Sequence, residues 1–160
     1  MEKSTQYEII ERTYAEAVKG LVADESILSD FERWNNYCLD LPRKEYVTYT
    51  ISVFDWQVKN GGFHQYFFNS YGLFCFYAVE NLREVKCMKH ADLLQKAISV
   101  IYDNSEPREV FIRNLFNRKV HLINTFDENI FQKFRPLEEE YYQIEEDNEI
   151  YNKLEGYLLE

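Results

Sequence analysis

Four polar side chains that can bind a small ligand are clustered around two glycines in the middle of the chain: Asn60, His64, Gln65 and Asn69. Amide and imidazole groups both donate and accept hydrogen bonds, so the four side chains can converge on one polar ligand. The alternative is that they cap helix ends and satisfy backbone groups beside a turn. No cysteine, Ser–His pair or carboxylate pair stands nearby to make His64 a recognisable general base. The cluster therefore indicates binding or structural support and gives no sign of catalysis.

Patterns that mark common metal, phosphate and nucleophile sites are absent from the sequence. The three histidines, at positions 64, 90 and 121, lack the spacing of zinc ligands. The acids of residues 138–147 lack the alternating Asp/Asn loop with a glycine that calcium requires. Gly61 and Gly62 have no following Lys or Ser to form a phosphate-binding loop, and there is no nucleophile elbow. We therefore expect no cofactor, no bound metal and no enzymatic activity.

Residues 53–72, VFDWQVKNGGFHQYFFNSYG, join the end of a long helix to a short second element. No Gly or Pro interrupts residues 44–59, where apolar residues at helical spacing cover an arc of roughly 220°. Such a helix should be surrounded by other helices. Its narrow polar strip is expected to hold Thr48, Ser52, Asp55 and Lys59. Asn60, Gly61 and Gly62 predict the end of this helix, because Asn and Gly accept the left-handed backbone conformation. Phe63, Tyr66 and Phe67 are expected to face the core.

The rest of the chain also has helical patterns. Apolar spacing predicts helices over residues 5–19, 29–39, 73–85, 90–102, 105–118 and 149–159. A further helix begins after Asp127, and Pro136 should kink or split it. The expected helix caps are Ser4 or Thr5, Ser29 or Asp30, Ser105, Asp127 and Asp147. Residues 20–25 are expected to be a turn, and residues 119–126 a loop or short extended segment. The prediction is a single all-α domain over residues 1–160, packed around a buried central helix, with acidic helices at both ends.

Composition places further bounds on the chain. Its 160 residues suit one domain, and five Gly with three Pro argue against a turn-rich all-β fold. No apolar run reaches the ~18 residues of a membrane span, and the first ten residues lack a signal-peptide pattern. The three cysteines, Cys38, Cys75 and Cys87, have no paired spacing and are expected to be reduced and mostly buried. We therefore expect a cytoplasmic protein.

Acidic charge is concentrated at the two ends of the chain. The net charge is -10; residues 1–40 hold nine acids and four bases, residues 127–160 hold eleven acids and three bases, and the middle is mildly basic. Such a chain should be repelled by nucleic acid and by anionic membranes, and a basic protein is its natural complement. The alternative is that the charge serves only solubility.

The last third of the chain is the candidate binding surface. Its acids are Glu138, Glu139, Glu140, Glu145, Glu146, Asp147 and Glu149. Rows of carboxylates on helix faces resemble the dense charge of DNA, about one per 1.7 Å of axis. A homodimer, or the N-terminal acids, would supply a second row. Those acids are Glu8, Glu11, Glu16, Asp24, Glu25 and Asp30. The sequence does not show that the two ends are adjacent. Tyr141, Tyr142 and Tyr151 can serve a dimer or partner surface if exposed, although Tyr is also common in cores.

The run NGGFHQYFFNSYG resembles the signature of the bacterial DNA-mimic protein family, which is also filed as a domain of unknown function. That signature is Asn-Gly-Gly-Phe-x-Gln-Tyr-Phe-x-Asn-x-x-Gly. It is matched here by Asn60, Gly61, Gly62, Phe63, Gln65, Tyr66, Phe67, Asn69 and Gly72. A weaker resemblance covers residues 78–98 and 126–159. The resemblance implies a regulator that binds a basic DNA-binding protein, a transcription regulator or nucleoid protein, in competition with DNA. The alternative is an acidic helical scaffold or a ligand-binding module that uses the Asn60–Asn69 motif.

Overall fold

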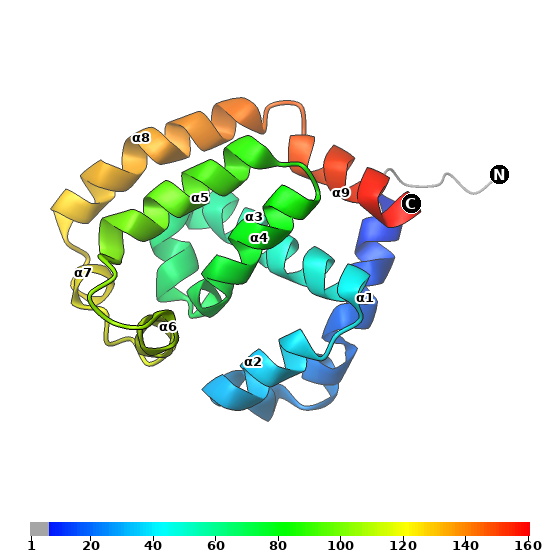
Figure 1. The fold of residues 1–160 in the computed structure, drawn as a ribbon, viewed down its shortest axis with the longest axis horizontal. Coiled ribbons are helices and arrows are strands. Elements are labelled where there is room, and N and C mark those ends of the chain that lie inside the picture. Colours follow the sequence, from blue (N-terminus) through cyan, green and yellow to red (C-terminus); the bar gives the residue numbers. More distant parts are fainter. Residues whose placement is uncertain (1–6) are drawn as a thin grey trace.

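The computed structural model describes residues 7–160, which form helices and connecting turns without any strand (Figure 1). The α-helices are α1 (Glu8–Ala23), α2 (Phe31–Leu39), α3 (Arg43–Phe68), α4 (Cys75–Glu84), α5 (Met88–Ile101), α6 (Arg108–Phe116), α7 (His121–Asn124), α8 (Glu128–Ile144) and α9 (Glu149–Leu159), and the 3₁₀ helices are η1 (Glu25–Ser29) and η2 (Tyr71–Phe74). The predicted all-α fold is confirmed. None of the helices in this range is long and apolar enough to cross a membrane.

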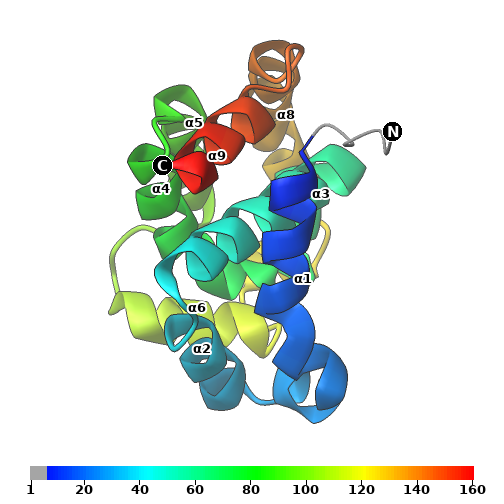
Figure 2. The same cartoon turned by 90° about the vertical axis from the view of Figure 1, so that its right-hand side faces the viewer.

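Helix α3 lies at the centre of the molecule and is packed by α1, α4 and α8 (Figures 1 and 2). Its apolar side chains face these helices, as predicted; Phe54, for example, is fully buried. The expected polar strip is mostly wrong, because Thr48, Ser52 and Asp55 are buried and only Lys59 is exposed. Helix α8 covers that side of α3, and its Tyr141 hydroxyl donates a hydrogen bond to Asp55. Trp56 belongs to the apolar residues of segment 44–59 that were expected to be surrounded by other helices, but it is 40% exposed.

Helix α3 is broken at Gly61 and Gly62, as their residue types predict. Gly62 has φ 76° and ψ -173°, a backbone conformation that glycine adopts far more readily than other residues. A Cβ atom at Gly62 would also overlap with the carboxylate of Glu138 on α8. The chain resumes helical geometry at once, so Phe63–Phe68 forms a second helical segment with a different direction. The break thus turns the chain without a loop.

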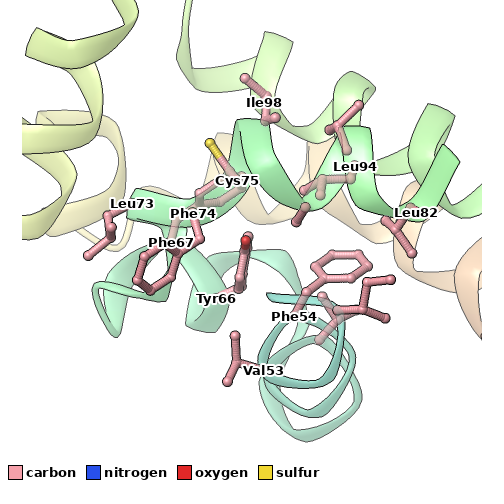
Figure 3. Packing of buried hydrophobic residues seen from close by; sticks show 14 of the residues in the cluster. Val53, Phe54, Tyr66, Phe67, Leu73, Phe74, Cys75, Leu82, Leu94 and Ile98 are labelled. Atoms are coloured by element: carbon pink, nitrogen blue, oxygen red, sulfur yellow. The ribbon is translucent and has the colours of Figure 1, made fainter. Parts of the chain in front are cut away.

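Aromatic rings fill the core where the two parts of α3 meet η2 and α4 (Figure 3). Phe54 packs edge-on against Tyr66, with ring centroids 5.2 Å apart, and Trp34 packs in the same way against Phe74 at 5.3 Å. Such pairs gain about 0.5–1.5 kcal/mol beyond the burial of their area. The three cysteines are free and buried, as expected.

The region after α6 differs from the expectation at residues 119–126 and, for the predicted split of the helix, at Pro136. Residues 119–126 contain the short helix α7 and no extended segment. The backbone N–H of Asn124 donates to the carbonyl of Val120, four residues earlier, as in a helix. Helix α8 runs through Pro136 without being split. Pro136 is exposed, so water can satisfy the carbonyl that loses its helical partner there.

The helix caps agree with the sequence at two places. Asp30 and Asp127 accept hydrogen bonds from the backbone N–H groups of Arg33 and Asn129, at 2.9 and 2.8 Å. Ser105 is not a cap, since Pro107 precedes the first residue of α6. The suggested caps Ser4 and Thr5 lie outside the described residues.

Two further boundaries differ from the sequence-based expectation. Helix α1 continues to Ala23, so the turn expected at residues 20–25 comes later, and η1 follows. Asp147 does not cap α9 with its side chain. Asn148 holds the cap position in the left-handed conformation, and its side chain makes no capping hydrogen bond.

The first and last helices lie side by side, which answers the question that the sequence left open (Figure 2). The Tyr7 hydroxyl, just before α1, donates to Asn152 Oδ1 of α9 at 2.8 Å. Trp56 of α3 is joined to α9 as well, because its indole N–H donates to the Tyr151 hydroxyl at 2.6 Å. The beginning of α1 and the beginning of α9 are therefore adjacent.

Candidate functional site

Glu138, which we expected on the acidic binding surface, is half-buried and turned toward the break in α3. Its Oε1 accepts a hydrogen bond from the Phe63 backbone N–H at 3.1 Å. That N–H opens the second segment of α3, where unpaired donors and the helix dipole favour an anion. Burial raises the pKa of Glu138, while the bond from Phe63 opposes the rise. Gly62 and Glu138 therefore form one structural unit, a role for Glu138 that the sequence did not predict.

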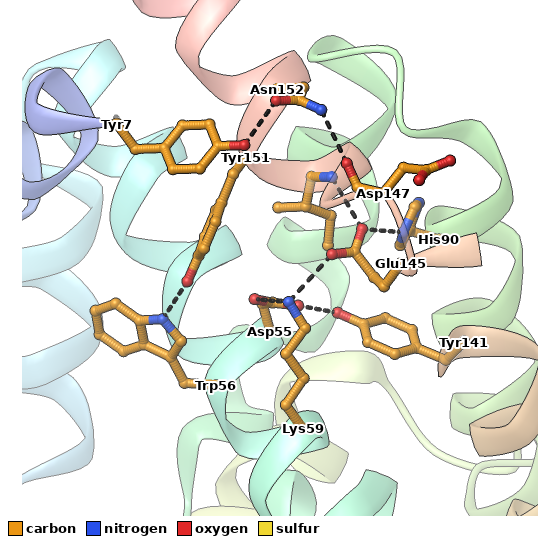
Figure 4. A network of polar contacts seen from close by, with 11 residues as sticks. Tyr7, Asp55, Trp56, Lys59, His90, Tyr141, Glu145, Asp147, Tyr151 and Asn152 are labelled. Carbon is orange, nitrogen blue, oxygen red and sulfur yellow. Dashed lines mark hydrogen bonds and ion pairs between the residues drawn. The ribbon is translucent and has the colours of Figure 1, made fainter. Parts of the chain in front are cut away.

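Glu145 is also not a surface residue, because only 2% of its side chain is exposed. Its Oε2 lies 3.1 Å from Lys59 Nζ, and its Oε1 lies 2.6 Å from His90 Nε2 (Figure 4). Oε1 also accepts from the Ile150 backbone N–H at 2.9 Å. Glu145, rather than the predicted Asp147, therefore caps the first turn of α9.

Lys59 extends this network to the central helix. Its Nζ donates to Asp55 Oδ2 at 2.9 Å, and the other oxygen of Asp55 accepts from the Tyr141 hydroxyl (Figure 4). The Asp55–Lys59–Glu145–His90 network therefore joins α3, α5 and the turn between α8 and α9. Sequence reasoning missed it, although Asp55 and Lys59 stand four residues apart on one helix face.

The pKa values of the network reflect competition between burial and pairing. Burial raises the pKa of Asp55, and the hydrogen bonds from Tyr141 and Lys59 oppose that rise. Burial also acts to raise the pKa of Glu145, but hydrogen bonds from His90, Ile150 and Lys59 outweigh it and hold the pKa below its usual value. Glu145 is thus stabilised as a carboxylate inside the protein.

The network has a structural function and no evident chemical one. Asp55 and His90 are both 0% exposed, so a substrate cannot reach them. Among residues 7–160 no group of three or more His, Cys, Asp or Glu is arranged to hold a metal ion. The charged groups instead attach the acidic C-terminal helices to the core.

The polar residues of the Asn60–Asn69 motif do not converge on one point. His64 is buried, its Nε2 lies 2.8 Å from the Ile123 carbonyl oxygen, and its ring stacks with that of Phe131 at 4.6 Å. The amides Asn60, Gln65 and Asn69 lie apart from this contact. They join one another through Gln57: Asn60 Nδ2 donates to Gln65 Oε1 (3.2 Å), and Gln65 Nε2 and Asn69 Nδ2 both donate to Gln57 Oε1 (3.0 and 2.9 Å).

These contacts agree with the structural alternative for the motif. His64 ties α7 to the second segment of α3, and the amides brace the outside of the break. Tyr66 is fully buried in the core, and Gly72 is buried beside Phe67. The role of Gln57 was not predicted, because helical spacing does not show which side chains a glutamine will contact.

Five of the predicted acids remain available to a partner, and we call them the exposed acids. They are Glu139, Glu140, Glu146 and Asp147, which are exposed, and Glu149, which is partly exposed. They lie at the end of α8, in the following turn and at the start of α9. Of the three tyrosines considered for a partner surface, Tyr141 is buried, Tyr142 is exposed and Tyr151 is half-buried.

The N-terminal acids divide into two groups along α1. Glu8 and Glu11 are exposed near the end of α1 that faces α9. Asp24 lies at the opposite end, across a helix of 16 residues, or about 24 Å. It is also paired with Arg33 at 2.9 Å. Only the first group can therefore extend the surface formed by the exposed acids.

A comparison with protein families now identifies the chain. A family model described as DMP19-like protein matches residues 39–160. The chain belongs to the DMP19-like family. The match confirms the resemblance found in the sequence. The DMP19-like family is a family of DNA-mimic proteins and not an enzyme family. No curated protein and no solved structure matches the chain significantly.

The DMP19-like match contains the structural units described above. It spans the broken helix α3, the Gly62–Glu138 contact, and the Asp55–Lys59–Glu145–His90 network. It also contains all of the exposed acids, whereas α1 and its acids precede it. The DMP19-like region thus comprises the core and the acidic C-terminal helices together.

Proposed function

We propose that this DMP19-like protein binds a basic DNA-binding protein by presenting carboxylates where DNA presents phosphates. Family membership supports a protein of the DNA-mimic type. The observation that carries the proposal is the position of the exposed acids, which gather around the α8–α9 turn while α1 brings Glu8 and Glu11 to the same side of the molecule. The lysines and arginines of a DNA-binding groove would pair with these carboxylates, and DNA would compete for the same groove.

The geometry also limits which acids contribute. Glu145 is buried, and Glu138 is half-buried with one oxygen bonded to the Phe63 N–H, so the proposed contacts come from the exposed acids. The partner class is a transcription regulator or a nucleoid protein, met in the cytoplasm and bound without chemistry. A homodimer would place two such surfaces in one particle and lengthen the charged row.

The test is capture of host proteins from a nuclease-treated lysate, with elution by rising salt. Nuclease removes partners that are held only through DNA. We expect a basic DNA-binding protein to be retained at low salt, released as salt screens the contacts, and displaced by added duplex DNA. Failure to retain any basic protein at low salt would overturn the proposal.

Two variants of equal net charge locate the surface. The first neutralises four exposed acids, E139Q/E140Q/E146Q/D147N, and the second neutralises four exposed acids elsewhere, E16Q/E80Q/D92N/E128Q. Mimicry by the proposed surface requires that the first variant loses the partner and the second keeps it. Equal loss in both would show that total charge, and no particular surface, governs binding.

A further inference from the structure

A cavity of about 350 Å³ opens between α1, α3 and α9, on the side where the two acidic ends meet. Among residues 7–160, its lining consists of Tyr7, Ile10, Glu11, Tyr14, Trp56 and Tyr151. Four of these six side chains are aromatic, and one is a carboxylate. We call the four rings, Tyr7, Tyr14, Trp56 and Tyr151, the aromatic cage. Neither the buried network nor the exposed acids described above account for it.

Hydrogen bonds and ring contacts hold the aromatic cage in place. The Tyr7 ring lies 5.3 Å from that of Tyr151, and the Tyr14 ring lies 4.7 Å from that of Trp56, between centroids. The Trp56 indole N–H donates to the Tyr151 hydroxyl, and the Tyr7 hydroxyl donates to Asn152. These hydrogen bonds hold three of the four rings before any ligand arrives, and Tyr14 packs against Trp56. Such preorganisation lowers the entropic cost of binding.

The lining is suited to a cation. Aromatic faces attract positive charge through the ring quadrupole, and Trp and Tyr are strong partners in such contacts. Tyr151 already makes one contact of this kind, with Lys59 Nζ 5.1 Å from its ring centroid. That lysine is neutralised by Asp55 at 2.9 Å and Glu145 at 3.1 Å. Among the described residues that line the cavity, Glu11 is the only charged one, and it gives this part of the lining a negative charge.

We propose that the aromatic cage receives the side chain of an arginine from the basic protein partner. This inference rests on the proposed function and names the contact that would add specificity to it. The planar guanidinium stacks on aromatic rings and can donate hydrogen bonds to the Glu11 carboxylate at the same time. Trp, Tyr and Arg are the residue types enriched among the few residues that dominate binding energy at interfaces. The exposed acids would attract a basic surface, and the cage would fix its register.

The probe for this proposal is the peptide acetyl-Gly-Arg-Gly-amide, compared with the same peptide carrying citrulline, a neutral analogue of arginine. Binding is followed by the indole N–H signals in an NMR titration of the full chain. Trp56 reports on the cage, and Trp34, which is buried in the core, serves as an internal reference. We expect the arginine peptide to shift the Trp56 signal saturably and the citrulline peptide to leave it unchanged. Equal shifts with both peptides, or none with either, would overturn the proposal.

Matched variants on one helix separate the site from general charge. E11Q should weaken arginine-peptide binding roughly two- to five-fold, the range for exposed ion pairs and cation–π contacts. E16Q removes the same charge from an exposed position of α1 outside the cavity and should bind like the wild type. Y7L should weaken binding by a similar factor because it removes one ring. Thermal unfolding by circular dichroism confirms that each variant is folded. Equal affinities for E11Q and E16Q would contradict the assignment.

Lys3 stands four residues before Tyr7 in the sequence, so K3A tests whether this lysine competes for the cage. If K3A by itself shifts the Trp56 signal and tightens peptide binding, the occupant is this chain's own lysine and the proposal fails. The titration needs no partner protein, so it is independent of the lysate experiment. If the chain captures its partner but the arginine peptide does not bind at the cage, only this inference is overturned. A cage that binds arginine in a chain that captures no basic protein overturns the proposed function alone.

Discussion

Replacing Glu145 by Gln should destabilise the protein far more than the same change at its neighbour Glu146. The Glu145 carboxylate accepts from Ile150 N at 2.9 Å and from Lys59 at 3.1 Å, and lies 2.6 Å from His90. Gln keeps the shape and one acceptor, but it removes the charge and turns a donor toward groups that donate. Breaking a buried ion pair costs about 3–5 kcal/mol, and the retained acceptor places E145Q near 3 kcal/mol.

Urea unfolding followed by circular dichroism at 222 nm measures the free energy of unfolding of each variant. For a protein of this size, a loss near 3 kcal/mol corresponds to a fall in Tm of roughly 6–12 °C. The exposed Glu146 makes no such contacts, so E146Q should stay within about 0.5 kcal/mol of the wild type. If E145Q also stays within that range, the buried network does not anchor α9 and the reasoning is refuted.

Three further predictions follow from the glycines, the acids and the thiols. G62A should lower the free energy of unfolding by more than about 1 kcal/mol, because alanine is strained at φ 76° and its methyl group meets Glu138. G156A, in an open position on α9, should raise the free energy of unfolding by about 0.5–1 kcal/mol. The same urea unfolding compares the two variants. Folding lowers the pKa of Glu145, so the stability that its carboxylate contributes is present above the unfolded pKa of about 4.3 and is lost as the pH falls through the lower folded pKa. The difference in free energy of unfolding between wild type and E145Q should therefore shrink below about pH 4. Burial raises the pKa of all three thiols, that of Cys87 to about 12, so a thiol reagent such as DTNB should label the folded protein slowly and the urea-unfolded protein at once.

The central helix and its break could be predicted because both depend on local chemistry. Apolar spacing over residues 44–59 and the backbone freedom of Gly61 and Gly62 are properties of neighbouring residues. The prediction for residues 119–126 was wrong because their structure depends on distant contacts. Their β-branched residues suggest an extended segment, but Ile123 is buried and its carbonyl meets His64, so tertiary packing selects a helix there.

The roles of Glu138 and Glu145 depended on partners far away in the sequence, yet one local signal was present. Phe134 and Tyr141 are inward residues of α8, and helical spacing places Glu138 and Glu145 on their face. An acidic side chain within an apolar stripe can be buried if a hydrogen-bond donor from elsewhere in the chain pairs with it. The donors, Phe63 N–H and Lys59, lie on α3, and the sequence gives no means of pairing them with these acids.

The aromatic cage is assembled from both sides of the boundary where the family match begins. Trp56 and Tyr151 lie within residues 39–160, whereas Tyr7, Glu11 and Tyr14 precede them. A related protein that kept the matched region but carried another first helix would retain half of the cage on the same scaffold. The remaining half could then offer a different shape or charge to a different basic side chain. On the proposed function, the first helix would then be the variable part of the binding surface and the matched region its constant framework.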